Sequence, residues 1–429
     1  MKQLFSGGIH PEGFKELSRG GEPTPVPAPE TVVIPLRQHI GSACEPLVSV
    51  GDSVLMGQKI GDGDSRSSPV HATVSGTVTA IEEREIPGGD RVKCVIIKND
   101  GKDTPAPMTG RASWLSLSAK EVADIVRECG IVGMGGAAFP TNSKIASTAG
   151  KTKDVLINAC ECEPYITSDD TEMCCFAHDV IGGAKLLCKV LGAEKSIIAI
   201  EDNKPEAAEA LKAELGDEPS VEIRVLPTRY PQGAKKQLIL AVTGREVAPN
   251  ARSGALFNVT TTANVYRAVT KGQPLLEKIV TVTGDGANEP KNMLVRIGTS
   301  FADVIKAAGG IKEETAQVIA GGPMMGKAVG SLDVPVVKGT NAILCLTKVS
   351  EAAAEPACIR CGKCVEVCPM NLQPLYLYRY ALAEDKEMLD EYYLNDCMEC
   401  GCCAFICPGK LPLTETFVKA KHMLKKGGK

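Results

Sequence analysis

The chain has 429 residues, 44% of them hydrophobic, and its 48 Lys and Arg against 52 Asp and Glu leave a formal net charge of −4. This balance excludes a strongly basic surface, so we do not expect a nucleic-acid partner. The sequence has no apolar run long enough to predict a membrane span or a signal peptide, which favours a cytoplasmic protein. Its 18 cysteines then indicate metal or redox chemistry rather than a disulfide scaffold.

The first hundred residues predict a leader followed by a small all-β module. Residues 1–30 form a leader whose stretch at residues 20–30 is Pro-rich and extended, and residues 31–100 contain short alternating runs separated by Gly or Pro, which is typical of strands. The order "VGDSVLMGQKIG" then "SPVHATVSGTV" is similar to lipoyl- and biotinyl-type barrel-sandwich domains, which carry a modified Lys on an exposed hairpin. The matching turn from Asp62 to Pro69 has no Lys, so we expect a scaffold without the swinging arm.

After a linker at residues 100–117, residues 118–270 alternate between helix and strand patterns. The helix "SAKEVADIVRECG" begins at a Ser with Glu three residues later and ends at a Gly. It is followed by the strand "DVLINA", a long helix over about residues 170–191, the strand "SIIAIE", the helix "KPEAAEALKAELG" and the strand "VEIRVLP". This alternation predicts an α/β domain with a largely parallel sheet.

Two further units complete the predicted fold. Residues 277–330 read as strand, strand, Gly-capped helix and strand, which predicts a β-grasp unit of the soluble-ligand-binding kind, and residues 340–429 form a cysteine-rich helical end. The predicted fold class is therefore a multidomain α/β and α+β chain: a barrel sandwich, an α/β domain, a β-grasp unit and a ferredoxin-like end.

The cysteine-rich end contains one spacing twice. Cysteines separated by two, two and three residues precede a Pro in each run, the spacing of bacterial ferredoxins that hold two [4Fe–4S] clusters. In that pattern the fourth Cys of each run ligates the cluster of the other run. We therefore assign two metal-ligand sets: Cys358, Cys361, Cys364 and Cys407 for the first cluster, and Cys368, Cys397, Cys400 and Cys403 for the second. Cys402 falls outside the repeat and should point away from the cluster. For the two runs as a whole, paired zinc sites are the alternative to iron–sulfur clusters.

A second candidate site begins at the glycine loop "GIVGMGGAAFPTNSK", residues 130–144. Glycines let the backbone approach a phosphate or a flat ring closely, and the following helix offers free N–H groups. Lys144 is placed to reach an anion there. The stretch "INACECEP" at residues 157–164 ends a strand, where α/β sheets bind ligands. A plain turn remains the alternative for each stretch taken alone.

Together these stretches resemble the flavin- and NADH-binding subunit of respiratory complex I. The family has F-P-T-x-x-K after its glycine loop, an Asn-Ala-x-Glu-x-Glu-Pro stretch and an Asn-Val-x-Thr segment, and all three are present here. The resemblance implies an FMN site at Gly133, Gly135, Gly136, Lys144, Asn158, Glu161, Tyr230, Gly233, Asn258 and Thr261. It places Phe139 and Glu163 on the nicotinamide side, as the residues nearest the chemistry.

The chain departs from that family at several positions. Cys160 replaces an Asp, and Gly233-Ala234-Lys235 replaces a Gly-Glu-Glu loop, so two acidic contacts to NADH are missing. The segment Ser253 to Leu256 nearly matches the S-G-A-T motif through which some flavoproteins link FMN covalently, but Leu256 offers no oxygen. FMN is therefore expected to be non-covalent.

The full order of segments is closer to a narrower family. "GGIHP" at residues 7–11, "VIPLRQHIG" at 33–41, "YPQGAKKQLI" at 230–239 and the C-terminal double cluster together resemble the C-subunit family of Rnf complexes, membrane-bound ferredoxin:NAD oxidoreductases. The resemblance implies an oxidoreductase subunit that exchanges hydride between NAD(H) and FMN and relays single electrons through two clusters. Its partners would be the other Rnf subunits, with ferredoxin met indirectly, on the cytoplasmic side of a membrane. The complex would couple this reaction to Na+ or H+ transport.

Two other functions stay open at this point. The first is a soluble relative, either a cobalamin reductase or an electron donor to an amino-acid reductase. The second is an electron-relay scaffold whose flavin site is empty, which the loss of acidic residues at Ala234 and Lys235 would favour.

Overall fold

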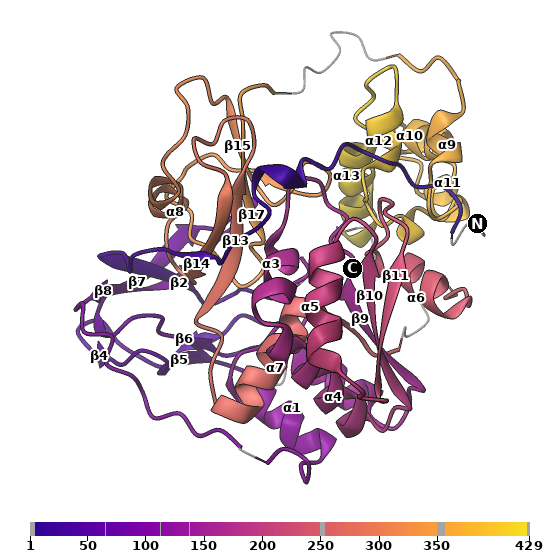
Figure 1. Ribbon diagram of the computed structural model, residues 1–429. Coiled ribbons are helices and arrows are strands. Elements are labelled where there is room, and N and C mark those ends of the chain that lie inside the picture. Colours follow the sequence, from indigo (N-terminus) through magenta and orange to yellow (C-terminus); the bar gives the residue numbers. More distant parts are fainter. Residues whose placement is uncertain are drawn as a thin grey trace.

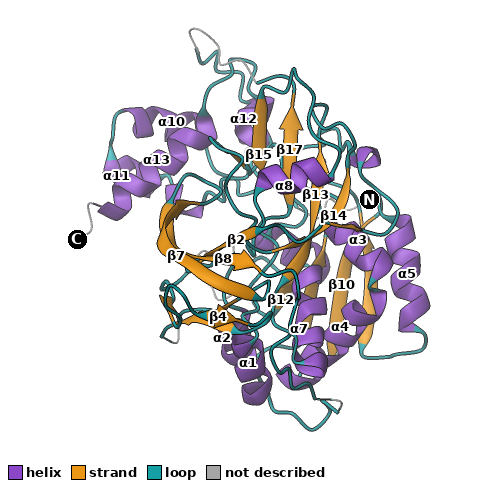
Figure 2. Cartoon of the chain, turned by 90° about the vertical axis from the view of Figure 1, so that its left-hand side faces the viewer, coloured by secondary structure: helices purple, strands orange, loops and turns teal. Residues whose placement is uncertain are grey.

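The computed structural model describes residues 5–64, 66–111, 113–136, 138–248, 254–349 and 357–426 (Figure 1). Its described strands form four sheets, and the last part of the chain is helical. In Figure 1 the two strand-rich modules lie on the same side of the α/β domain, and Figure 2 shows the helices α10 (Pro374–Leu382), α11 (Lys386–Glu391) and α13 (Leu413–Lys426) grouped at one end. Among the described residues, no helix combines the length and the apolar character that crossing a membrane requires.

The N-terminal module is a barrel sandwich of two sheets, ordered β2-β8-β7-β4 and β3-β5-β6. Its strands are β2 (Thr31–Pro35), β3 (Glu45–Pro46), β4 (Ser53–Val54), β5 (Lys59–Asp62), β6 (Val70–His71), β7 (Gly76–Glu85) and β8 (Arg91–Asn99). Buried aliphatic side chains from both sheets, such as Val32, Ile60 and Ile97, form its core. This arrangement confirms the predicted barrel sandwich.

The turn that would carry the modified Lys in a lipoyl-type domain is tied to the neighbouring domain. Asp62 accepts a hydrogen bond of 2.7 Å from the guanidinium of Arg127, in helix α1 (Ala119–Glu128). Lys59 bonds Asp62 as well, at 3.0 Å. The bond from Arg127 holds the turn against the α/β domain, so the module is a fixed part of the structure.

The α/β domain confirms the predicted parallel sheet, ordered β11-β10-β9-β12 with every neighbouring pair parallel. Its further elements are α2 (Thr141–Thr148), β9 (Asp154–Ala159), α3 (Ser168–Cys175), α4 (Ala177–Leu191), β10 (Lys195–Glu201), α5 (Pro205–Leu215), β11 (Val221–Leu226), α6 (Lys235–Thr243), β12 (Leu256–Asn258) and α7 (Val259–Lys271). Helix α1 has the expected capping box, in which the Ser118 and Glu121 side chains bond each other's backbone N–H. Because the chain adds strands on both sides of β9, the carboxyl end of β9 is a switch point at which such sheets bind ligands.

The prediction of a single long helix over about residues 170–191 is wrong, because the helix is interrupted at Phe176. The backbone of Phe176 is non-helical, with φ −128° and ψ 35°, and the guanidinium of Arg267 lies 4.8 Å from the centre of its ring. The break gives α3 its own direction, and α4 packs closely on α7. At Gly183 in α4 a Cβ would lie only 2.2 Å from the carbonyl oxygen of Thr262 in α7.

The third module is a β-grasp sheet that recruits strands from outside the predicted range 277–330. The sheet is ordered β1-β14-β13-β17-β15-β16. Its elements are β1 (Thr24–Pro25), β13 (Glu277–Thr283), β14 (Lys291–Arg296), α8 (Phe301–Ala307), β15 (Gln317–Ala320), β16 (Lys327–Ala328) and β17 (Ala342–Leu346). Strand β1 comes from the predicted leader and pairs with β14. Strand β17 comes from the range assigned to the cysteine-rich end and pairs with β13 and β15.

The C-terminal end is a group of short helices around the two cysteine runs. They are α9 (Lys363–Glu366), α10 (Pro374–Leu382), α11 (Lys386–Glu391), η2 (Leu394–Asp396), α12 (Cys402–Ile406) and α13 (Leu413–Lys426). A small core that includes Leu377, Leu389 and Phe417 holds them together. The leader, which carries the short helix η1 (Lys15–Leu17), runs from this helical end to the β-grasp sheet (Figure 1).

We expect Gly183→Ala to loosen the α4–α7 contact that supports the site. The new methyl group cannot fit beside Thr262, and such overpacking costs about 1–3 kcal/mol of stability. The thermal midpoint followed by circular dichroism should therefore fall by several degrees. Gly330→Ala is the matched control, because a Cβ there meets no atom within 4 Å. Equal midpoints for the two variants would contradict the packing argument.

Candidate functional site

Two asparagines meet at the carboxyl edge of the parallel sheet. Asn158 is the last residue but one of β9, Asn258 ends β12, and the two are register partners. Asn258 caps α7 by accepting a hydrogen bond of 3.1 Å from the N–H of Thr261, and its amide donates to Asp169 at 2.7 Å. The amide of Asn158 donates to the carbonyl oxygen of Gly233 at 2.8 Å. The structure thus brings together two segments that lie a hundred residues apart in the sequence.

The glycine loop lies over these asparagines. Its ends meet where the N–H of Gly133 donates to the carbonyl of Phe139 at 2.8 Å, and the N–H of Met134 donates to the Thr261 hydroxyl at 2.8 Å. A Cβ on Gly135 would lie 3.2 Å from the Asn258 side chain, so a larger residue would press on that contact. At Gly136 φ is 113°, and an added Cβ would meet no atom within 4 Å. The outer face of the loop is therefore bare backbone, which suits close approach of a ligand.

Lys144 lies under the same edge of the sheet. Its ammonium donates to the carbonyl of Leu256 at 2.7 Å and lies 5.3 Å from the ring centre of Phe257. Burial, with a smaller contribution from the nearby charge of Lys235, lowers the pKa of Lys144 to about 8. Two cationic side chains converge here with no carboxylate hydrogen-bonded to Lys144 among the described residues, so this position favours an anion.

Glu161 is engaged inside the protein. Its carboxylate accepts hydrogen bonds from the N–H of Asp169 at 2.7 Å and from the Ser168 hydroxyl at 3.2 Å, at the start of α3. Burial first, and then the charge of Asp169, raises the pKa of Glu161 to about 8, against the opposing effect of Lys15 and Lys204. The contact of Glu161 with a flavin stays a prediction, and in this structure the side chain orders the loop that follows β9.

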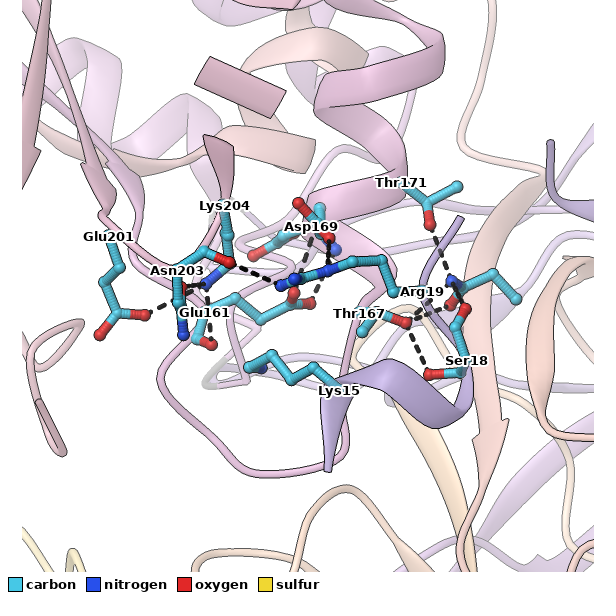
Figure 3. A network of polar contacts seen from close by, with 12 residues as sticks. Lys15, Ser18, Arg19, Glu161, Thr167, Asp169, Thr171, Glu201, Asn203 and Lys204 are labelled. Atoms are coloured by element: carbon cyan, nitrogen blue, oxygen red, sulfur yellow. Dashed lines mark hydrogen bonds and ion pairs between the residues drawn. The ribbon is translucent and has the colours of Figure 1, made fainter. Parts of the chain in front are cut away.

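A buried network of lysines surrounds that loop, and Figure 3 shows it. The Lys15 ammonium donates to the carbonyls of Glu163 and Ile166, at 3.0 and 2.6 Å. Lys204 is completely buried and bonds the carboxylate of Glu201 at 3.2 Å and the carbonyl of Glu161 at 3.4 Å. The sequence analysis missed Lys15 and Lys204, because neither belongs to a motif and only the fold brings them to the loop.

The two residues predicted on the nicotinamide side have different surroundings. The Phe139 side chain is 42% exposed on the glycine loop. Glu163 instead accepts hydrogen bonds from the N–H groups of Met324 and Met325, at 2.7 and 3.1 Å, in the turn after β15. The carboxylate of Glu163 therefore joins the α/β domain to the β-grasp module. Its contact with a nicotinamide also stays a prediction.

Tyr230 and Gly233 connect the sheet edge to the cysteine-rich end. A Cβ on Gly233 would lie 2.4 Å from the carbonyl oxygen of Cys160, so only glycine fits there. Tyr230 is buried, and its hydroxyl donates to the carbonyl oxygen of Cys400 at 2.7 Å. Tyr230 thus touches the cysteine end directly, a contact that the sequence analysis did not include.

Five cysteines line one pocket in the helical end, and four of them are Cys368, Cys397, Cys400 and Cys403. These four are the residues that the spacing assigned to the second cluster, and they come from both runs, so the thiol donors for one tetranuclear cluster are gathered. Cys402 also borders this pocket, where it is buried beside Tyr230 and Ile9. It has not turned away from the pocket as expected, and its exclusion from the ligands rests on spacing alone.

The other four cysteines lie toward the outside of the helical end. Cys364 and Cys407 are half-buried against its core, whereas Cys358 and Cys361 are exposed. Burial first, and then the charges of Cys407 and Cys358, raise the pKa of Cys364. The set combines both runs, as the crossed assignment requires.

The pocket of the second set faces the α/β domain. Besides the Tyr230 contact, the side-chain amide of Gln237 donates to the carbonyl of Pro369 at 2.8 Å, and the Lys236 ammonium lies 3.6 Å from the carboxylate of Asp396. The leader adds a hydrogen bond of 2.8 Å from the N–H of Gly8 to the carbonyl of Val367. The two neighbouring lysines therefore have different surroundings: Lys236 lies between the α/β domain and the helical end, and Lys235 lies near Lys144.

Leu256 lies in β12, where its carbonyl accepts the Lys144 hydrogen bond. The neighbouring Ser253 lies outside the described residues. The expected absence of a covalent flavin link therefore depends on the identity of residue 256, which has no hydroxyl.

Family models match four parts of the chain. The RnfC barrel sandwich hybrid domain matches residues 3–102, and the Nuo51 FMN-binding domain matches residues 126–267. The SLBB domain matches residues 279–328, and the 4Fe-4S dicluster domain matches residues 357–410. These matches confirm the predicted fold class and the predicted cofactor classes, FMN and iron–sulfur clusters; the exact domain boundaries stay predictions.

Curated relatives match over most of the chain. The C subunit of the Na(+)-translocating ferredoxin:NAD(+) oxidoreductase complex of Acetobacterium woodii is 44% identical over 92% of this chain and 90% of its own length. The proton-translocating counterpart of Clostridium ljungdahlii is 44% identical over 88% of this chain and 84% of its own. The C subunit of the ion-translocating oxidoreductase complex of Serratia proteamaculans is 42% identical over 98% of this chain, which spans 61% of that longer relative.

Similar solved structures include two crystal structures of an NAD+-reducing [NiFe]-hydrogenase. The H2-reduced and air-oxidized states both give a TM-score of 0.48, with 18% and 17% sequence identity. The match covers 74% of this chain and 64% or 66% of the hydrogenase chain.

We expect Cys407→Ala to damage the cluster of the first set, although Cys407 lies in the second run. In the crossed pattern it is the fourth ligand of the cluster built on Cys358, so chemical analysis should find iron and sulfide falling from about eight atoms of each per chain towards about four. Cys402→Ala is the control and should keep the full content. Full content in the Cys407 variant, or loss of a cluster in the Cys402 variant, would refute the assignment.

Proposed function

We infer the role of this chain from its family, because it belongs to the C subunits of ion-translocating ferredoxin:NAD(+) oxidoreductase complexes. The chain is the NAD(H)-binding, FMN- and iron–sulfur-containing subunit of such a complex. It takes hydride from NADH or returns it to NAD+, and it passes single electrons to or from other subunits. The complex as a whole couples this exchange to the transport of Na+ or H+.

The observation that carries this proposal is the continuous contact from the glycine loop to the cysteine pocket. The loop lies on Asn258, Asn158 bonds the Gly233 segment, and Tyr230 three residues earlier bonds Cys400. A flavin exchanges two electrons as hydride and also one electron at a time, which is what a nicotinamide and an iron–sulfur cluster require between them. The chain provides a site for each on adjoining elements.

The residues around the sheet edge are suited to hold FMN without a covalent bond. The bare outer face of Gly135 and Gly136 admits the flat ring or the phosphate closely, and the N-terminus of α2 follows directly. Lys144 and Lys235 supply positive charge for the phosphate. Asn158, Asn258 and Thr261 hold the loop and the sheet edge in register. In this proposal Glu161 acts by ordering the loop after β9.

The placement of the cysteines suggests the order of the two clusters. The set with Cys400 adjoins Tyr230 and the α/β domain, so it is the set nearer to the flavin site. The set with Cys358 and Cys361 is exposed, so it is the set that meets another subunit. Electrons released from NADH would pass through the inner set first and leave through the outer set.

The attachment of this subunit follows from its partners. Since its relatives are named as subunits of ion-translocating complexes, the chain is held at the membrane by other subunits. We place it on the cytoplasmic side, where NAD(H) is available. The exposed cysteine set is then directed to a subunit that continues the electron path.

The purified full-length chain, after cluster reconstitution, tests this function directly. It should bind about one FMN per chain, measured by fluorescence after acid release, and should reduce an artificial electron acceptor with NADH. A chain with intact clusters that takes up no flavin and shows no NADH-dependent turnover would contradict the proposal. That result would favour an electron-relay scaffold with an empty flavin site.

Lys144→Ala should weaken FMN binding by roughly tenfold to a hundredfold, since a hydrogen bond to a charged group contributes about 1.5–3 kcal/mol. Equilibrium titration of the flavin-free chain measures this change. Lys151→Ala is the matched control, because Lys151 is an exposed lysine after the same helix. Equal affinity in both variants would remove Lys144 from the site.

The same titration should depend on pH. The ammonium of Lys144 loses its proton as the pH rises through about 8, so the affinity of the wild-type chain for FMN should fall above that pH. Lys144→Ala should lack this part of the pH dependence. An identical decline in the variant would assign it to another group.

A further inference from the structure

The segment "LRQHIG" at residues 36–41 belongs to the barrel sandwich but contacts the glycine loop of the α/β domain. The N–H of Ile40 donates to the carbonyl oxygen of Ala138 at 3.3 Å. Ala138 directly precedes Phe139 and has a positive φ of 46°, unusual for a residue other than glycine. The barrel sandwich thus contacts the residue that sets the direction of Phe139.

The segment is held firmly on both sides of Ile40. The side-chain oxygen of Gln38 accepts a hydrogen bond of 3.0 Å from the N–H of Lys338, and the ring of His39 accepts one of 3.0 Å from the N–H of Ser68. At Gly41 φ is 141°, and a Cβ would lie 2.1 Å from the carbonyl oxygen of Arg66. The backbone around Ile40 therefore has little freedom to move.

One buried ammonium fixes the barrel sandwich against the start of the glycine loop. Lys338, only 1% exposed, donates to the carbonyl of Pro69 at 2.6 Å and to the carbonyl of Gly130 at 2.7 Å. Pro69 belongs to the barrel sandwich, whereas Gly130 opens the glycine loop. Desolvating an ammonium is costly unless it keeps such acceptors, so the two modules keep this relative position.

Within this rigid arrangement, two large apolar side chains remain open to solvent. Ile40 is 59% exposed and Phe139 is 42% exposed. The backbone hydrogen bond between Ile40 and Ala138 keeps the segments of Ile40 and Phe139 next to each other at the glycine loop. An aliphatic and an aromatic side chain so placed offer apolar surface to a flat ring, and covering them with a ring would be favourable.

We propose that Ile40 contacts NAD(H), so that the barrel sandwich forms a fixed wall of the nucleotide site beside Phe139. This inference rests on the proposed function and names a substrate contact outside the α/β domain. It also assigns a function to a barrel sandwich that lacks the modified Lys, because the wall of a binding site has to be rigid. The contact is apolar, so it affects the affinity for the dinucleotide and leaves FMN and the clusters unchanged.

The test measures NAD+ binding by calorimetry to the full-length chain with FMN and both clusters in place. Ile40→Asp should raise the dissociation constant at least tenfold, because it removes the apolar face and adds a negative charge near a diphosphate. Ile40→Ala should raise it by about threefold to tenfold, and Ile40→Leu should restore most of the affinity. In turnover with NADH, KM should rise while kcat stays near the wild-type value.

Val50 supplies the matched control. It is 62% exposed in the same module, in a turn that makes no hydrogen bond to the glycine loop in the described part of the chain. Val50→Asp and Val50→Ala should bind NAD+ like the wild type. ADP-ribose as a second probe assigns the half of the dinucleotide: lost affinity for it places the adenine half on Ile40, and loss confined to NAD+ places the nicotinamide half there.

Three results separate failure of this inference from failure of the proposed function. A wild-type chain that binds no NAD+ contradicts the proposed function itself. A wild-type chain that binds NAD+ while Ile40→Asp binds it within twofold overturns only the role of Ile40. A lower flavin content or thermal midpoint in Ile40→Ala also overturns that role, because it shows that the side chain supports the loop.

Discussion

The arrangement of the modules depends on buried ammonium groups that find their acceptors across module boundaries. Lys15 of the leader bonds two carbonyls of the α/β domain, and Lys338 bonds one carbonyl of the barrel sandwich and one of the glycine loop. Within the β-grasp module, Lys278 of β13 bonds the carbonyl of Lys338. Burial lowers the pKa of Lys278 and Lys338 to about 7, and a carbonyl accepts from the neutral amine as well as from the ammonium. Because a buried donor without an acceptor is costly, few relative positions of the modules satisfy both Lys15 and Lys338.

This constraint gives the candidate site its composite character. The glycine loop belongs to the α/β domain, yet its start is held by a lysine of the β-grasp module and its end is bonded by the barrel sandwich. Glu163, from the loop after β9, bonds the β-grasp turn at Met324, and Gly401 of the cysteine pocket packs against the same residue. Each module thus supplies a boundary of one continuous region, which suits a reaction whose redox groups have to keep fixed separations.

The parts of the structure that could be predicted from sequence are those determined by neighbours in the chain. The capping box of α1 and the strands β9 to β11 follow from residues at short spacings, and the grouping of the second cysteine set follows from one spacing that occurs in two runs. Long-range contacts determine the rest. The break at Phe176 depends on packing against α7, and β1 and β17 find their partners in a module that begins or ends far from them. The family resemblance located Glu161 and Glu163, but their hydrogen-bond partners come from α3 and from the turn after β15.

The path of the leader has a consequence for the order in which the chain acquires its structure. Residues 8 to 25 leave the ribosome before the segments they contact. Lys15 bonds carbonyls near residue 165, β1 pairs with β14, and Gly8 bonds Val367, and all of these partners lie later in the sequence. The last contact of the leader, the bond from Gly8 to Val367, therefore cannot form until most of the chain has been synthesised. Gly7 packs on the carbonyl of Cys368, so the final docking of the leader takes place beside a proposed ligand of the inner cluster. An early segment thus closes the structure over a module made much later, and a chain interrupted before residue 367 would leave the leader unattached at this point.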